Sequence, residues 1–281
     1  MFQRDYSRDL KNSLNLIKKE RIIVQDKISA RPLVSVILPT LNADLTISNT
    51  LSCLIEQSYK NIELVVVDGG STDSTLEIVK NSGLRLVLKR QEGRGIWGAI
   101  NEALEMANGE FLFSLNADDL ISNYAISKLV EQATSTDADC LWLPTYSAGG
   151  FKNTLNFNRR WLGMDRVTPG HSASFFISLD FQRRLGKYDE GIKFCADHEL
   201  FYRALTNSAR MSIASDHRKA YGIFTHGGFS ASNEYIDKVI EEWHFRKAGS
   251  LNDIQDFMFC SFVVPLKVVW SMIKKIKSFL I

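Results

Sequence analysis

Short runs of β-branched and aliphatic residues alternate with helix-patterned stretches through the first half of the chain, and this alternation constrains the fold most. The apolar runs are 34–38, 62–67, 84–88 and 110–115, and apolar residues recur at helical spacing between them. Strands that alternate with helices in this way are typical of a parallel sheet with helices on both faces. We therefore predict an α/β fold, a doubly wound and mostly parallel sheet, with appended N- and C-terminal helices.

Polar or glycine-rich segments follow the predicted strands. They are Pro39-Thr40, Asp68-Gly69-Gly70, residues 90–94 and residues 116–119. Because the carboxyl ends of parallel strands share one edge of the sheet, these segments are expected to meet there. Ligands of such sheets bind at this edge, where the strand order reverses.

Two adjacent carboxylates, Asp118 and Asp119, end the apolar run Phe111-Leu112-Phe113. Neighbouring carboxylates repel each other, and a hard divalent cation with oxygen ligands and phosphate partners relieves that repulsion. This pattern is compatible with a metal site, although a polar turn after an edge strand is the simpler interpretation of the motif taken alone.

The composition is that of an ordinary globular protein. The chain has 281 residues, of which 45% are hydrophobic and 23% charged, enough for one large domain or two modest ones. A net charge of +2 gives no general case for nucleic-acid binding. There is no GxGxxG after the first strand and no P-loop, so a dinucleotide or P-loop site is unsupported.

The four cysteines are far apart in the sequence and form no CxxC pair or zinc pattern; they are Cys53, Cys140, Cys195 and Cys260. Reduced thiols in a cytoplasmic protein fit this usage. Residues 1–31 are highly charged and lack the apolar core of a secretory signal, and their spacing predicts an appended helix.

The C-terminal region, residues 250–281, combines an apolar stretch with lysines. Residues 257–273 are apolar but interrupted by Pro265 and Lys267, and three lysines follow at 274, 275 and 277. The stretch is too short and broken for a typical spanning helix, so we expect an amphipathic helix at the cytoplasmic face of the membrane. A helix packed on the core or on another subunit is the alternative.

Five motifs in order resemble the inverting family-2 glycosyltransferases, whose A-type fold matches the fold predicted above. The motifs are VSVILPTLN (34–42), VDGGSTDST (67–75), GIWGAIN (95–101), ANGE (107–110) and LNADD (115–119), and the ADHEL helix start (196–200) continues the match. The resemblance implies a nucleotide-sugar half at 32–120 and an acceptor half at 121–249. It also implies a UDP-sugar donor and a divalent metal, Mn²⁺ or Mg²⁺.

The resemblance assigns roles by position. Asp197 matches the catalytic base, Asp118 the metal-contacting last acid of the DxD motif, and Asp68 an acid near the nucleoside. The predicted nucleotide-sugar contacts are Pro39, Thr40, Asn42, Asp68, Arg94, Asn116, Ala117 and Asp118. Asn116, Gly69 and Gly98 depart from the family, which often has acids there.

A second group of residues is assigned to the acceptor side. His171, Trp97 and His198 are predicted to line the acceptor pocket, and His226 is a further candidate for the metal or the diphosphate. Three of them have a simpler alternative: a core histidine for His171, a core aromatic on an amphipathic helix for Trp97, and an exposed histidine in a glycine turn for His226. For Asp197 the alternative is a first-turn acid favoured by the helix dipole.

The resemblance, together with the expected C-terminal helix, implies an inverting hexosyltransferase that moves a sugar to a saccharide or lipid-linked hydroxyl in bacterial surface-polysaccharide assembly. One rival is a catalytically inactive nucleotide-sugar-binding protein of the same fold. The other is a metal-dependent nucleotidyltransferase, against which the absence of Lys and Arg from residues 39–45 argues. The sugar, acceptor, linkage and oligomeric state stay open.

Overall fold

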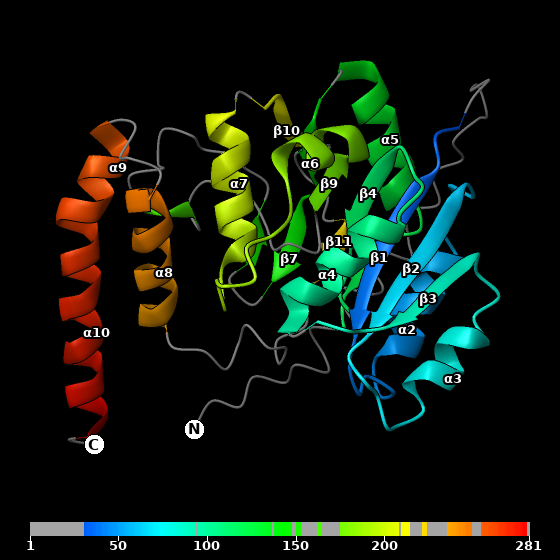
Figure 1. The fold of residues 1–281 in the computed structure, drawn as a ribbon, viewed down its shortest axis with the longest axis horizontal. Helices are drawn as coiled ribbons and strands as arrows, with labels where there is room; N and C mark the ends of the chain where they lie inside the picture. The colour runs from blue at the N-terminus through cyan, green and yellow to red at the C-terminus, as the bar shows by residue number, and fades with distance from the viewer. Residues whose placement is uncertain are drawn as a thin grey trace.

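A computed structural model of the chain describes residues 31–93, 95–136, 138–147, 150–152, 162–164, 175–207, 209–213, 221–223, 235–248 and 254–279. Figure 1 shows a central sheet with helices on both sides and a separate group of C-terminal helices at one end. The predicted N-terminal extension lies almost entirely outside the described residues.

In the described part of the chain, seven strands form the main sheet, in the order β10-β6-β9-β4-β1-β2-β3. In chain order they are β1 (Val34–Thr40), β2 (Ile62–Asp68), β3 (Leu86–Arg90), β4 (Phe111–Ser114), β6 (Cys140–Trp142), β9 (Phe175–Ser178) and β10 (Met211–Ile213). β1 pairs in parallel with β2 and β4, and β2 pairs in parallel with β3. β9 is antiparallel to both β4 and β6, so the sheet is mixed but mostly parallel.

Helices cover both faces of this sheet. The helices of the first half are α2 (Ile47–Ile55), α3 (Thr75–Lys80), α4 (Gly95–Met106) and α5 (Ala125–Thr136), and those of the second are α6 (Leu179–Leu185) and α7 (Ala196–Thr206). One apolar core joins α2, α3 and α5 to alternate strand residues such as Val36 and Val66. The other joins α4, α6 and α7 to the intervening residues, such as Ile37 and Val65. This alternation follows from the period of two in a β-strand buried on both sides.

A smaller sheet has the order β5-β11-β7-β8. Its strands are β5 (Leu120–Ile121), β7 (Thr145–Ser147), β8 (Gly150–Lys152) and β11 (Gly222–Ile223). β5 follows directly after the Asn116–Asp119 segment and pairs with β11. This pairing fixes the exit of that segment from β4.

The C-terminal group consists of α8 (Tyr235–Ala248), α9 (Ile254–Met258), a π-helical turn η4 (Phe259–Val263) and α10 (Val264–Phe279). A buried ionic cluster joins α8 to α9. Arg246 is 0% exposed and bonds Glu242 at 2.6 Å and Asp256 at 2.8 Å. Tyr202 of α7 donates a hydrogen bond to Asp256 at 2.8 Å, which links this group to the main domain.

The sequence did not indicate the setting of one aromatic residue. Trp142 lies in β6, fully buried, and packs against Phe175 and Phe201. β6 has only three residues, which is too few to show the period of two that marks a strand in the sequence.

Candidate active site

The carboxyl edge of the parallel strands gathers the predicted donor segments. β4, β1 and β2 are adjacent and parallel, so Asn116–Asp119, residues 41–46 and residues 69–74 all leave the sheet on the same side. From β1 the chain adds β2 and β3 on one side, and it then crosses back to add β4 on the other side. Folds of this kind bind ligands at such a reversal of strand order.

Asp197 reaches the same edge by a different route. α7 precedes β10, and β10 is parallel to β6, which runs in the same direction as β4 because both are antiparallel to β9. The start of α7 therefore lies on the carboxyl side of the sheet. The segment before α7 runs along α4 toward that helix's first turn, where Trp97 Nε1 donates a hydrogen bond to the Lys193 carbonyl at 3.1 Å. The fold thus brings the predicted base to the edge that carries the donor segments (Figure 1).

The loops after β1 and β2 are tied together by hydrogen bonds. Asn42 adopts φ 47°, a left-handed conformation that asparagine tolerates better than most residues. Its side-chain oxygen accepts from the Thr72 amide at 2.9 Å, and its own amide donates to Ser71 Oγ at 2.9 Å. The Asp44 amide donates to Asp73 at 3.2 Å. Asn42, a predicted donor contact, therefore also fixes the shape of the edge.

Asp68 is buried and holds the turn that follows β2 through hydrogen bonds. Its side chain is 1% exposed, and Oδ2 accepts from the amides of Gly70 and Ser71 at 2.9 Å each. Oδ1 accepts from the hydroxyls of Ser71 and Thr40. These bonds hold the glycine turn and Thr40 in place. A contact between Asp68 and the nucleoside stays a prediction.

The segment after β4 holds its two acids differently. Asp119 is 3% exposed, and its carboxylate accepts from Asn116 Nδ2 at 2.9 Å. Thr50 of α2 donates to the Asp119 carbonyl at 2.9 Å. Asp118 is only partly buried and stands between these anchored residues, next to Ala117. The hydrogen bond from Asn116 therefore stabilises the Asp119 carboxylate beside Asp118. Of the two acids, Asp118 is the more accessible.

Two of the family departures are neighbours in space. A Cβ built on Gly69 would lie 3.3 Å from Gln91 Oε1, and one on Gly98 would lie 3.3 Å from Gln91 Nε2 and 3.5 Å from Glu190 Oε2. Glu190 is held by Asn101 Nδ2 at 2.9 Å. An amide and a carboxylate from other segments thus fill the space beside the two glycines, which the sequence pattern did not indicate.

The loop that leads to Arg94 is anchored by Glu102 of α4. This carboxylate accepts from the Gly93 amide at 2.7 Å and the Glu92 amide at 3.0 Å. The Gly93 amide bond, together with Lys89, lowers the pKa of Glu102. Arg94 itself lies outside the described residues, so its diphosphate contact stays a prediction.

The predicted acceptor residues differ in their setting. Asp197 and His198 are partly buried in the first turn of α7, and Asp197 Oδ1 accepts from the His198 amide at 2.9 Å. Trp97 is 8% exposed and stacks on Tyr188 with ring centroids 5.3 Å apart. Trp97 therefore packs against the segment that precedes α7. His171 lies outside the described residues.

The oxygen donors at this edge suit a hard cation. Mg²⁺ and related ions bind through one or two carboxylates plus substrate phosphates and water, and Asp118 offers such a carboxylate. Among the described residues no group of three or more His, Cys, Asp and Glu side chains is arranged to hold a metal. His226 is not described.

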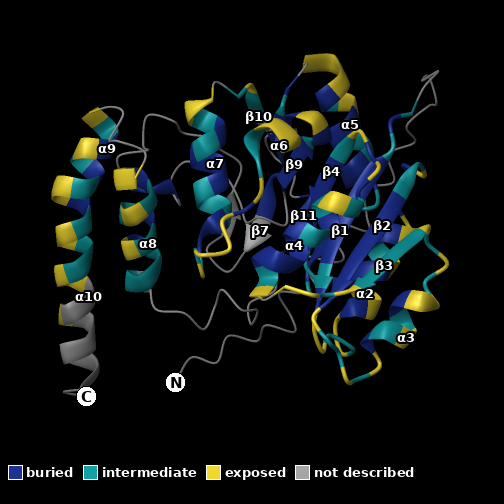
Figure 2. Cartoon of the chain, in the orientation of Figure 1, coloured by how far each residue is buried: buried dark blue, intermediate teal, exposed yellow. Residues whose placement is uncertain are grey.

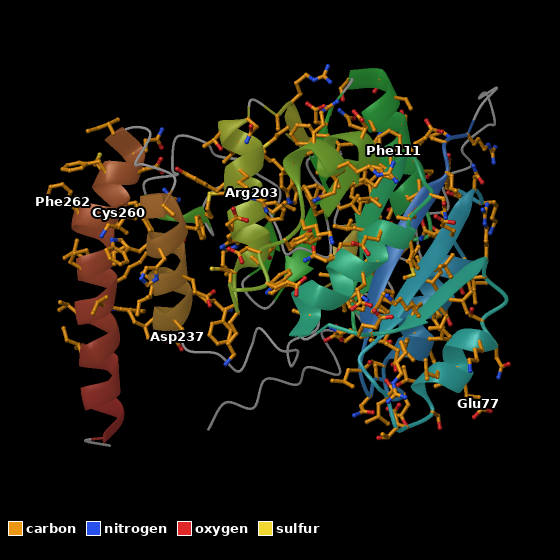
Figure 3. All side chains as sticks on the ribbon, viewed as in Figure 1. Glu77, Phe111, Arg203, Asp237, Cys260 and Phe262 are labelled. Atoms are coloured by element: carbon orange, nitrogen blue, oxygen red, sulfur yellow. The ribbon has the colours of Figure 1, made fainter. Side chains whose placement is uncertain are left out.

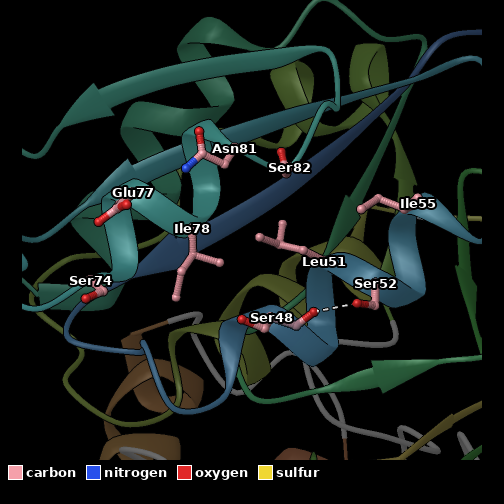
Figure 4. Close-up of a pocket in the computed structure, with 9 residues that line it drawn as sticks. All are labelled: Ser48, Leu51, Ser52, Ile55, Ser74, Glu77, Ile78, Asn81 and Ser82. Atoms are coloured by element: carbon pink, nitrogen blue, oxygen red, sulfur yellow. Dashed lines mark hydrogen bonds between the residues drawn. The ribbon is translucent and has the colours of Figure 1, made fainter.

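A shallow hollow of about 490 Å³ lies elsewhere, between α2 and α3 (Figure 4). It is lined by serines, Asn81, Glu77 and the aliphatic Leu51, Ile55 and Ile78. None of the predicted site residues that the structure describes lines it, so it is separate from the edge described above.

Comparison with known proteins identifies the class. The sequence signature of glycosyl transferase family 2 matches residues 35–206, which span the donor segments and α7. The chain belongs to this family, and its mixed, mostly parallel sheet with flanking helices is the A-type glycosyltransferase fold.

Two relatives show the kind of protein it resembles. A "PGL/p-HBAD biosynthesis glycosyltransferase" of Mycobacterium tuberculosis is 40% identical over 191 residues, which cover 64% of this chain and 72% of the relative. The Escherichia coli "UDP-Glc:alpha-D-GlcNAc-diphosphoundecaprenol beta-1,3-glucosyltransferase WfgD" is 41% identical over 90 residues, covering 31% of this chain and 36% of the relative.

Two solved structures share the fold. Residues 1–349 of TarS from S. aureus, in complex with UDP-GlcNAc, match with a TM-score of 0.65 and 24% identity, over 82% of this chain and 71% of that one. The mannosyltransferase PcManGT from Pyrobaculum calidifontis, in complex with GDP-Man and Mn²⁺, matches with a TM-score of 0.65 and 19% identity, over 95% and 80%.

Proposed function

We propose that this glycosyltransferase moves a hexose from a UDP-sugar to a hydroxyl of a saccharide or lipid-linked acceptor, with inversion, in the assembly of a bacterial surface glycan. The observation that carries this proposal is topological. In a family-2 chain, the segments after β1, β2 and β4 leave the same edge of the sheet that the start of α7 reaches with Asp197.

The proposed chemistry needs one base and one stabilised leaving group. Asp197 accepts the proton of the acceptor hydroxyl as that oxygen bonds to the anomeric carbon. The sugar–phosphate bond breaks on the opposite face and the electron pair leaves with the diphosphate, so the configuration at that carbon inverts. A divalent cation, when bound through Asp118, neutralises charge on the diphosphate. The Asp68 turn and the Asn42 loop shape the nucleotide side of the edge.

The names of relatives support the donor and acceptor classes. WfgD takes UDP-Glc and a diphosphoundecaprenol-linked sugar, and a TarS structure holds UDP-GlcNAc. The PcManGT structure holds GDP-Man and Mn²⁺. It supports a metal-dependent nucleotide-sugar site, but its nucleobase is guanine and not uracil. The choice of a uridine donor therefore needs a direct test.

A thermal-shift panel tests the donor. UDP-glucose, UDP-GlcNAc, UDP-galactose and GDP-mannose are compared with and without Mn²⁺. We expect one UDP-sugar to raise the melting temperature by several degrees only when Mn²⁺ is present, because a ligand that binds the folded state stabilises it. A shift with GDP-mannose alone would contradict the uridine assignment, and no shift with any donor would contradict the proposed function.

Two substitutions separate the base from the metal ligand. Asp197→Asn should lower donor turnover by about 10²- to 10⁴-fold and leave Mn²⁺-dependent UDP binding intact. Asp118→Ala should abolish that dependence on Mn²⁺. The control is Asp180→Asn, which neutralises an exposed carboxylate of α6. Normal turnover by Asp197→Asn would overturn the base assignment. Turnover absent from the wild-type protein, with UDP binding retained, would favour the inactive binding protein.

We further propose that the C-terminal helices place the enzyme on the cytoplasmic membrane surface, close to a lipid-linked acceptor. No helix in the described part of the chain is long and apolar enough to cross a bilayer. One side of this helical group nevertheless exposes large apolar side chains, and Figures 2 and 3 show this side facing away from the main domain. The exposed residues are Phe257, Phe262, Leu266, Val269, Trp270 and Ile273.

Lysines accompany this apolar face. Lys267 lies in the same helix, and positions 274, 275 and 277 in its last turns are also lysine. A helix that combines an exposed apolar face with several lysines suits anionic headgroups. The full chain should float with vesicles that contain anionic lipid, and Leu266→Glu/Trp270→Glu should not. Flotation of neither would contradict membrane binding, equal flotation of both would contradict binding through this face, and a dimer that only the wild type forms would assign the face to a second copy.

A further inference from the structure

Glu241 of α8 binds the segment that leads into α7. Its Oε1 accepts from the Lys193 amide at 2.9 Å, and its Oε2 accepts from the amides of Phe194 at 2.9 Å and Cys195 at 3.1 Å. The Cys195 thiol donates to the same oxygen at 3.2 Å. One carboxylate therefore fixes three consecutive residues.

The chemistry of Cys195 supports this arrangement. Its side chain is 1% exposed, and burial together with the Glu241 carboxylate raises the pKa of its thiol. The sulfur therefore stays protonated and remains a donor. Cys195 is also the residue that precedes the first turn of α7, where it makes no side-chain capping bond to the helix. Glu241, which lies on another helix, instead accepts the hydrogen bonds that hold this end of α7.

The same segment is held from the opposite side by α4. Trp97 Nε1 donates to the Lys193 carbonyl at 3.1 Å, so residue 193 is bonded through both its amide and its carbonyl. Asn101 donates to the Tyr188 carbonyl and accepts from the Tyr188 amide, each at 2.9 Å. Residues 188–195 are thus clasped between α4 and α8.

We propose that Glu241 is a positioning residue for the transfer reaction, because it fixes the start of α7 and so the place of Asp197. The proposal rests on the proposed function, in which Asp197 is the base. Asp197 is two residues from the last amide that Glu241 binds. Proton transfer requires the base within hydrogen-bond reach of the acceptor, and a misplacement of about 1 Å costs as much as 100-fold in rate.

The test compares Glu241→Gln with Asp237→Asn in the full chain. Both changes neutralise a carboxylate on α8, but no hydrogen bond of Asp237 is seen among the described residues. Figure 3 labels Asp237 on this helix. The assay follows UDP release from the UDP-sugar that stabilises the wild-type protein, with water as the accepting hydroxyl, so no acceptor need be known. Hydrogen exchange of peptides covering 193–197 reports on the clasp itself.

We expect Glu241→Gln to lower kcat about 10- to 100-fold, with the donor KM and the Mn²⁺-dependent affinity for UDP within twofold of wild type. Exchange at 193–195 should accelerate, because the amides lose their shared acceptor. Asp237→Asn should change neither. Faster exchange with an unchanged kcat would make the clasp purely structural and overturn the proposal, as would unchanged exchange.

A milder variant covers the case in which Glu241→Gln does not fold. Cys195→Ala removes one donor and keeps the carboxylate and the three amides. It should lower kcat severalfold and accelerate exchange to a smaller extent, and an unchanged kcat would overturn the proposal. A wild-type protein that releases no UDP would instead refute the proposed function, while the exchange data would still report on the clasp.

Discussion

Breaking the buried ionic cluster of α8 should destabilise the protein strongly. Arg246 is 0% exposed and bonds Glu242 and Asp256, which are 5% and 0% exposed. Its guanidinium also lies 4.3 Å above the Phe259 ring of η4. Arg246→Met would keep an unbranched, though shorter, side chain and would leave two buried carboxylates without their cation.

The expected magnitude follows from that burial. Removing one partner of a buried ion pair costs about 3–5 kcal/mol, because the remaining charge is left without compensation. Each kcal/mol lowers the melting temperature of a domain of this size by about 2–4 °C, so Arg246→Met should melt about 6–20 °C below wild type. Differential scanning fluorimetry at pH 7 measures this shift.

Arg184→Met is the matched control. Arg184 also pairs with a carboxylate one turn earlier, Asp180, but these side chains are 63% and 79% exposed. Exposed pairs contribute little, so this variant should melt within a few degrees of wild type. Equal shifts for the two variants, or a shift under 1 °C for Arg246→Met, would refute the reasoning. Replacing Glu242, Arg246 and Asp256 together by Leu, Met and Leu should recover part of the loss, because no buried charge remains.

Three further predictions concern single residues. Burial alone would raise the pKa of Asp139, but hydrogen bonds from the Arg210 side chain and amide outweigh it and lower that pKa. The stability from this pair is therefore present above the unfolded-state pKa of about 4 and is lost as the pH falls through the folded-state value, so Asp139→Asn should flatten the stability profile below about pH 4 in urea titrations. Gly109→Ala should destabilise severely, since its Cβ would lie 2.7 Å from backbone atoms near the start of β1. Asn116→Asp should melt lower without metal but gain more from Mn²⁺ than wild type, because it places a second carboxylate against Asp119.

Each of these has a contrasting outcome. An unchanged acid profile in Asp139→Asn would show that other carboxylates dominate the acid transition. Gly98→Ala serves as the control for Gly109→Ala, since its Cβ would meet only flexible side chains. Equal stabilisation of Asn116→Asp and wild type by Mn²⁺ would place the cation away from this turn.

The elements of the first half of the chain could be predicted because their information is local. The strands end where polar turns begin, and β2 was predicted at 62–67 and observed at Ile62–Asp68. The start of α7 at Ala196 was also readable from Asp197 and the apolar spacing after it. The antiparallel insertion of β9 between β4 and β6 was not, because a strand of four residues, three of them apolar, is compatible with several pairings.

The support of the candidate base could not be read from the sequence. Glu241 lies 46 to 48 residues from its partners, and Glu190 lies 89 residues from Asn101. A carboxylate on a charged helix such as α8 has the pattern of a solvated face, and its partners are backbone amides that carry no sequence signal. Only the packing of α8 beside α7 reveals the difference.

α8 therefore has two adjacent acids, Glu241 and Glu242, that bind different parts of the protein. Successive helical residues point about 100° apart, and here Glu241 faces the segment before α7 whereas Glu242 faces Arg246 and the Met164 amide. If the ionic cluster sets the position of α8, Arg246→Met should also accelerate hydrogen exchange at 193–195 and lower kcat at temperatures well below its melting point. If exchange there stays at the wild-type rate while the melting temperature falls, the cluster stabilises the C-terminal helices alone and Glu241 holds the entry to α7 independently of it.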